Sequence, residues 1–181
     1  MESRSLGLFV LPSLPRAAPL SPPNLAHVIA SSPTIPPQYC SANDDQDDCH
    51  LSGSAVRGGL EKIIFEGGVD LVFGAHEHAY ERNYPVYQSS WSGETGPSAY
   101  VNANRPIHIL SGAAGCPENQ DPWQPARKAN EFSAVRINDY GYGILRVVNE
   151  TTIAWSYKDN VKGAVLDEVT IVKTKQNFPP A

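Results

Sequence analysis

Apolar and polar residues follow patterns that predict a mixed α and β structure from about residue 54 onward. Ala55, Leu60, Ile63 and Ile64 fit the apolar stripe of a short helix, which the glycines at 67–68 would end. Residues 69–73 then form a short, almost continuous apolar strand, which is typical of a strand buried on both faces. Residues 107–110 predict another strand, which runs into the small residues at 111–115.

The C-terminal part of the chain contains closely spaced strand candidates. They cover residues 132–137, 142–148, 152–157 and 165–172, with turn signals at Asp139, Asn149 and Asp159-Asn160. Residues 88–105 are rich in Ser, Gly, Pro and Asn, which predicts a long surface loop. The globular part is therefore expected to combine helix and strand and to end in an antiparallel meander.

The N-terminal segment, residues 1–38, has a different composition. It holds many prolines and no sustained hydrophobic period, so it cannot offer a continuous ladder of backbone hydrogen bonds. We interpret it as disordered or irregular. The apolar stretch 6–11 after a basic start faintly resembles a secretory signal, but prolines interrupt it and no convincing cleavage pattern follows.

Composition narrows the choice of partners. The 181 residues are 41% hydrophobic and 18% charged, which suits one domain with a buried core. A formal net charge of −5 without a block of Lys or Arg argues against nucleic acid or an anionic membrane as a partner. No apolar run reaches membrane-spanning length. A soluble protein is expected.

The most informative motif is a histidine pair directly after the strand at 69–73. His76 and His78 stand two residues apart, where they can point imidazole nitrogens at the same or neighbouring points. The carboxyl ends of strands in an α/β sheet are where ligands and metals usually bind, and imidazole suits zinc, iron and similar ions. An isolated His-x-His pair more often satisfies ordinary hydrogen bonds, so the surrounding sequence decides the interpretation.

The stretch from Val69 to Arg82 resembles the last metal-binding motif of purple acid phosphatases: a strand, a small residue, His-x-His, an aromatic residue and Glu-Arg. Tyr39-Cys40-Ser41 with the following Asp-rich loop is similar to the upstream segment of animal-type members. Downstream, the blocks at 106–116, 132–136 and 139–142 match the family's C-terminal strands. The resemblance covers roughly residues 38–175, with several separated blocks in the right order.

The resemblance implies a fold and a chemistry. The family's catalytic domain is a four-layer α/β/β/α metallophosphoesterase sandwich, of which this chain would supply the later strands. By resemblance, His76 would bind the divalent ion (zinc, iron or manganese) and His78 the ferric ion of a binuclear centre that hydrolyses small phosphate monoesters. Glu81 and Arg82 would hold the ligand loop in place as outer-shell groups rather than touch substrate.

The chain departs from the family upstream of residue 39. The family's other ligands lie in Gly-Asp and Gly-Asn-His motifs and in a His-x-Pro-x-Tyr pattern. No glycine in this chain is followed by Asp or Asn, and Ile35 stands where the last pattern has its histidine. Residues 1–38 are therefore expected to be foreign to the family, residues 39–175 to be the C-terminal part of the catalytic domain, and 176–181 a tail. Because two histidines cannot satisfy two ions, we expect weak metal binding and little phosphatase activity from this chain alone.

Other functions stay open at this stage. A non-catalytic remnant or a binding or decoy module would share the same sequence, and a diesterase would share the histidine loop but not the C-terminal blocks. An unpaired sheet edge would favour self-association.

Smaller signals concern the compartment. Cys40 and Cys49 could form a disulfide in a secreted protein, or remain thiols in a reducing compartment. Asn149 begins the only glycosylation sequon, and the resemblance implies a secreted or extracellular glycoprotein. His108, inside an apolar strand, is interpreted as a core histidine.

Overall fold

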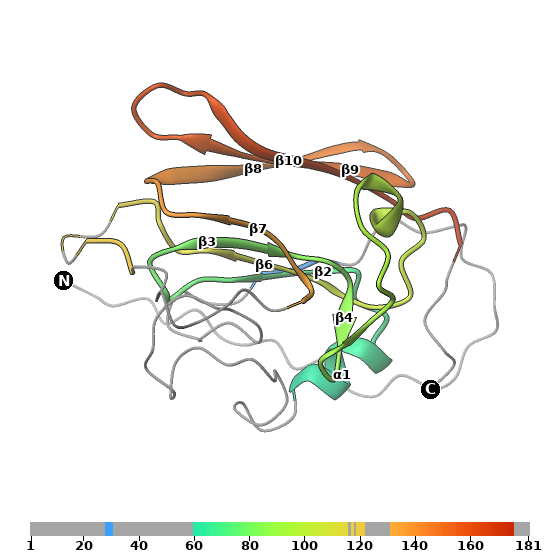
Figure 1. Ribbon diagram of the computed structural model, residues 1–181. Helices are drawn as coiled ribbons and strands as arrows, with labels where there is room; N and C mark the ends of the chain where they lie inside the picture. Colours follow the sequence, from blue (N-terminus) through green and yellow to red (C-terminus); the bar gives the residue numbers. More distant parts are fainter. Residues whose placement is uncertain (1–27, 31–59, 116, 118, 122–130, 176–181) are drawn as a thin grey trace, which may run out of the picture.

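A computed structural model describes residues 28–30, 60–115, 117, 119–121 and 131–175. The strands in this part of the chain form two main sheets (Figure 1). The five-stranded sheet has the order β1-β2-β6-β3-β7, and the three-stranded sheet has the order β10-β9-β8. The strands of the first are β1 (Val28–Ala30), β2 (Leu71–Gly74), β3 (Tyr80–Asn83), β6 (Ile107–Ser111) and β7 (Ser133–Ile137). Those of the second are β8 (Gly141–Asn149), β9 (Thr152–Asp159) and β10 (Val165–Val172).

The described elements stack in three layers. Figure 1 shows helix α1 (Leu60–Glu66) on one side of the five-stranded sheet and the three-stranded sheet on the other. A short hairpin of β4 (Val86–Tyr87) and β5 (Ser90–Trp91) and the 3-10 helix η1 (Pro97–Tyr100) flank the sheets. This arrangement agrees with the expected part of an α/β/β/α sandwich. No helix in the described ranges is long and apolar enough to cross a membrane.

The main core lies between the two sheets. Alternate residues of β2 and β6 face it, because Leu71 pairs with Ile107 and all side chains of one parity share a face. Tyr80 stacks on Tyr157 with ring centroids 4.0 Å apart. The other face of β2 packs Val72 against Ile64 of α1. The prediction that the strand at 69–73 is buried on both faces is thus confirmed.

Glycines in β8 make room for aromatic residues of β9. A Cβ at Gly143 would lie 1.7 Å from a ring carbon of Trp155, and one at Gly141 would lie 2.6 Å from the ring of Tyr157. The two rings can therefore cross over β8 only because these positions lack side chains. Gly141 and Gly143 thus allow the inner face of the three-stranded sheet to pack its largest side chains.

Several expectations need correction. The helix is present, but Leu60 and Ile63 are exposed, and Glu61 is buried instead because its carboxylate accepts a hydrogen bond from the backbone N–H of Gln88 at 2.6 Å. Ala55 lies outside the described residues. The segment 88–105 is not simply a surface loop, because η1 buries Tyr100 in the core.

Two further corrections concern strands. Residues 1–38 were expected to be irregular, but β1 within that segment pairs in parallel with β2. The strand predicted at 132–137 forms as β7, yet it pairs with β3 in the five-stranded sheet, so only β8, β9 and β10 make the antiparallel meander. The strand β3 was not predicted.

Candidate metal centre

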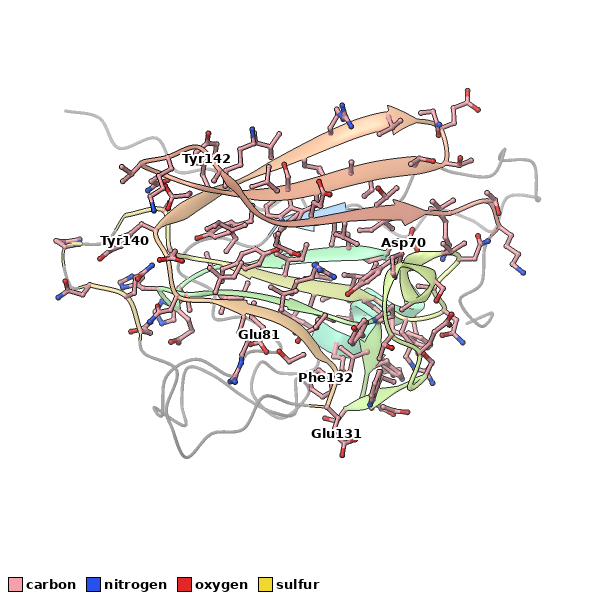
Figure 2. All side chains as sticks on the ribbon, turned by 45° about the horizontal axis from the view of Figure 1, so that its top comes forward. Asp70, Glu81, Glu131, Phe132, Tyr140 and Tyr142 are labelled. Carbon is pink, nitrogen blue, oxygen red and sulfur yellow. The ribbon has the colours of Figure 1, made fainter. Side chains whose placement is uncertain are left out.

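The histidine pair lies in the loop that joins β2 to β3. Strands β2 and β6 are parallel neighbours, so their carboxyl ends meet at one edge of the sheet. Asp70 precedes β2 and lies at the opposite end of the molecule from Tyr140 in Figure 2. The loop after β2 therefore lies at the Tyr140 end, where the backbone N–H of Gly141 donates to the carbonyl of Ala113 at 3.0 Å.

The two histidines differ in their environments. His76 is exposed and has a φ of 82°, in the left-handed region that non-glycine residues rarely adopt. His78 is half-buried, and its ring nitrogen Nδ1 lies 3.3 Å from the carbonyl oxygen of Asn119. Such backbone geometry gathers at functional sites when the surrounding structure enforces it.

The loop after β6 enforces the path of the histidine loop. Gly112 donates its backbone N–H to the carbonyl of Ala79 at 3.1 Å. A Cβ on Gly112 would stand 1.9 Å from the carbonyl oxygen of Glu77, between the two histidines. Only a glycine allows this approach, so the loops after β2 and β6 fit together as one unit.

A third loop contacts His78. The backbone N–H of His78 donates to Oδ2 of Asp121 at 2.6 Å, and the backbone N–H of Asp121 donates back to the carbonyl of His78 at 3.2 Å. Neither Asn119 nor Asp121 was predicted from the sequence. No local pattern marks them, because the fold brings them to His78 from 41 and 43 positions further along the chain.

The predicted outer-shell residues occupy opposite faces of β3. Arg82 faces the three-stranded sheet, where Nε and Nη2 each donate to the carboxylate of Asp167 at 2.7 Å, and its guanidinium also contacts the hydroxyl of Tyr100. Arg82 therefore holds the two sheets together. Glu81 is fully buried on the other face of β3, with Leu110 and Arg136 as its cross-strand neighbours.

The ion pair of Arg82 and Asp167 is charged although it is buried. Burial would raise the pKa of the Asp167 carboxyl, but the hydrogen bonds from Arg82 and Tyr80 outweigh burial and lower it. Burial, reinforced by Asp167, raises the pKa of Tyr80 far above its usual range. Trp155 donates its indole N–H to the Tyr80 hydroxyl at 2.9 Å, which completes the network.

The remaining predicted residues lie away from the histidine pair or outside the described ranges. His108 is buried in β6, where desolvation lowers its pKa to about 3 and keeps the ring neutral. Asn149 is exposed at the end of β8, and its Oδ1 accepts hydrogen bonds from Thr151. Cys40 and Cys49 lie outside the described residues.

The donors present fit part of a metal centre. Imidazole nitrogens suit zinc and iron, and a metal-binding histidine usually gives its other ring N–H to a carbonyl or carboxylate, as Nδ1 of His78 can give its hydrogen to Asn119. Within the described ranges, no group of three or more His, Cys, Asp and Glu side chains is placed to hold an ion. His76 and His78 are the two imidazole side chains that the loop after β2 carries.

Comparison with known proteins places this chain in a family. The family model described as iron/zinc purple acid phosphatase-like protein C matches residues 105–168. Acid phosphatase type 7 of Danio rerio is 41% identical over 150 residues, which is 77% of this chain and 33% of that protein. Acid phosphatase type 7 of Homo sapiens is 39% identical over 145 residues, which is 76% of this chain and 32% of that protein.

A solved structure agrees with these sequence matches. The purple acid phosphatase PPD1 from yellow lupin (Lupinus luteus) seeds matches with a TM-score of 0.68 and 20% identity over 85% of this chain and 27% of that one. This likeness shows a shared fold. The chain spans about a third of the length of the curated relatives it matches. The sequence matches and the shared fold together show that the chain belongs to the purple acid phosphatase family and carries its C-terminal region.

Proposed function

We propose that this chain supplies the His-x-His pair of a binuclear metal centre that hydrolyses phosphate monoesters. The observation that carries the proposal is the loop with His76 and His78 at the common carboxyl edge of β2 and β6, in a member of an iron/zinc phosphatase family. Bound ions would supply charge stabilisation of the phosphoryl oxygens and activation of water.

The chain's own residues hold donors in place. His76 would offer an imidazole nitrogen to the divalent ion and His78 one to the ferric ion. Gly112 keeps the loop between them close to the end of β6. Arg82 and Asp167 form a buried ion pair that joins the five-stranded sheet to the three-stranded sheet. A rigid supporting shell of this kind is what metal geometry requires.

We propose further that this centre is incomplete in the chain as it stands. A stable site usually has at least three protein ligands per ion, and two histidines fall short of that for two ions. No glycine of the chain is followed by Asp or Asn, and Ile35 replaces a ligand by resemblance. The match covers 33% of the Danio rerio relative. A polypeptide of that length would have room for the other ligands in its remaining two thirds.

Metal and phosphatase assays test the proposal together. The purified chain is loaded with zinc and iron, dialysed, and assayed with a generic phosphate monoester at acid pH. We expect weak zinc binding that both His76→Ala and His78→Ala reduce, and negligible turnover. His50→Ala, which removes a histidine outside the Val69–Arg82 motif, serves as the control and should leave zinc binding unchanged.

The outcomes separate the two parts of the proposal. Two ions retained per chain with turnover would contradict the incompleteness. Zinc binding that is equal in wild type, His76→Ala and His78→Ala would contradict the metal role of the pair.

We also propose that the protein is secreted and glycosylated at Asn149. The exposed position of Asn149 at the β8–β9 turn supports this, since glycans attach to accessible sequons. Expression in secreting eukaryotic cells should give a product whose mobility shifts on treatment with a peptide N-glycosidase, and Asn149→Gln should remove the shift. An unshifted wild-type product from the secretory route would contradict the proposal.

Self-association through β8 is a further proposal. Ile144, Leu145 and Val147 are exposed on this edge strand, and apolar edge strands favour pairing with another chain. Light scattering should show concentration-dependent oligomers that Val147→Lys reduces. A wild-type chain that stays monomeric at high concentration would refute this.

A further inference from the structure

The loop Asn119–Asp121 clamps His78 through three hydrogen bonds. In the first, the backbone N–H of His78 donates to Oδ2 of Asp121 at 2.6 Å. In the second, the backbone N–H of Asp121 donates to the carbonyl of His78 at 3.2 Å. The third joins Nδ1 of His78 to the carbonyl oxygen of Asn119 at 3.3 Å. The ring and the backbone of His78 are therefore both fixed by the same short loop.

The third bond selects a tautomer. A backbone carbonyl can only accept a hydrogen bond, so Nδ1 of His78 must carry the proton in this contact. In the neutral imidazole, Nε2 then has the free lone pair. A metal ion needs that lone pair, so the contact leaves His78 with Nε2 as its donor atom.

The backbone of Asn119 contributes to the same geometry. Its φ of 77° is in the left-handed region, which asparagine tolerates better than most residues. The contact with His78 is made by the carbonyl of Asn119 and not by its side chain. A glycine at position 119 could therefore keep the contact, whereas a β-branched residue would disfavour this conformation.

We propose that Asp121 is a positioning residue for the metal ligand His78. Its carboxylate and backbone N–H hold the loop against His78, which keeps the Asn119 carbonyl at Nδ1 and leaves Nε2 to bind an ion. This inference rests on the proposed function only for the last step, since the tautomer belongs to the metal-free chain.

The first test reads the tautomer directly in the metal-free protein. Nitrogen-15 NMR of the imidazole rings at mildly basic pH should show His78 with its proton on Nδ1. Asp121→Ala should move the proton toward Nε2, and Asp121→Asn should keep the wild-type signals because an amide oxygen still accepts from the His78 N–H. Glu94→Ala, which removes an exposed carboxylate in the loop before η1, is the matched control. An unchanged His78 tautomer in Asp121→Ala would overturn the proposal.

The second test measures zinc affinity by titration with the metal alone. Asp121→Ala should weaken zinc binding about 10- to 100-fold, the effect typical of lost outer-shell partners, while Asp121→Asn stays near wild type. An equal loss in Asp121→Asn and Asp121→Ala would mean that the carboxylate acts by its charge or as a ligand, and would overturn the positioning role.

A third variant distinguishes this proposal from the proposed function. If His78→Ala leaves zinc affinity unchanged, the metal role of the pair is refuted. The His78 tautomer, compared between wild type and Asp121→Ala, still decides the role of Asp121. Asn119→Gly should retain the Nδ1–H tautomer and Asn119→Val should lose it. The reverse order would contradict the assignment of the Asn119 carbonyl as the partner.

Discussion

Removal of the Asp167 carboxylate should destabilise the fold severely. Asp167 on β10 accepts hydrogen bonds from Arg82 at 2.7 Å and from the hydroxyl of Tyr80 at 2.6 Å. Arg82 is 7% exposed and Asp167 is 9% exposed, so both charges are largely shielded from water. In Asp167→Ala the guanidinium would remain between the sheets without its carboxylate. The two sheets would then lose the ion pair that joins them.

The size of the effect follows from the burial of the pair. Loss of one partner of a buried ion pair costs about 3–5 kcal/mol, mainly because the other charge stays buried. This is a large share of the roughly 5–15 kcal/mol by which domains are usually stable. For a chain of this size it corresponds to a fall in Tm of roughly 6–20 °C.

Thermal and urea unfolding followed by circular dichroism measure this loss. Glu168→Ala is the matched control, because Glu168 is the next residue on β10 and is exposed; it should change stability by less than about 0.5 kcal/mol. The double variant Arg82→Met, Asp167→Leu should be more stable than Asp167→Ala, because it leaves no buried charge. An Asp167→Ala variant within about 1 kcal/mol of wild type would refute the structural role assigned to the pair.

Three further predictions test the sheets and the loops. First, the pKa of His108 is lowered to about 3 by burial, so the unfolded chain takes up a proton below about pH 6.5 and the native chain does not. Stability should therefore fall as the pH drops from 7 to 5, by about 2 kcal/mol from this residue, and urea unfolding of His108→Leu should lack that part of the slope; an unchanged slope would contradict it. Second, Gly143→Ala should cost about 1–3 kcal/mol and alter Trp155 fluorescence, because its Cβ would meet the indole, and Trp155→Leu in the same chain should relieve the clash; additive losses in the double variant would count against this packing. Third, Gly112→Ala should weaken zinc binding more than Ala114→Ser does, since its Cβ would push on the carbonyl of Glu77; equal zinc affinities in a titration would show that the two loops are not coupled.

The sequence predicted well those elements in which apolar side chains occupy the buried positions. The strand after α1 was predictable because Leu71 and Val72 fill the cores on opposite faces of one sheet. The strands β8, β9 and β10 followed from their apolar content and clear turns. Their pairing is local along the chain, so neighbouring signals were enough to predict the meander.

The failures have a common physical cause in contacts between distant residues. The strand β3 has the polar sequence Tyr-Glu-Arg-Asn and looks exposed, yet Arg82 is buried by a partner 85 residues away. In α1, periodicity placed Leu60 and Ile63 in the core, but the fold buries Glu61 through its bond to Gln88. Composition cannot reveal such tertiary partners.

In the candidate site, too, residues marked by a local pattern were predictable and residues defined by distant contacts were not. His76 and His78 were predictable because a His-x-His pair after a buried strand is a local pattern. Asn119 and Asp121 were not, because one acts through a backbone carbonyl and both depend on a loop brought across the sheet edge. Gly112 is likewise recognisable only once the path of the histidine loop is known.

The most direct test of the metal site is a zinc titration of the isotope-labelled chain followed by NMR of the backbone amides. A metal centre at the histidine pair predicts that the largest shifts occur at residues 75–79, 111–114 and 119–121, the three loops around the pair. These shifts should vanish in the His76→Ala, His78→Ala double variant. Shifts that centre elsewhere, or that persist in the double variant, would contradict a metal centre at the shared carboxyl edge of β2 and β6.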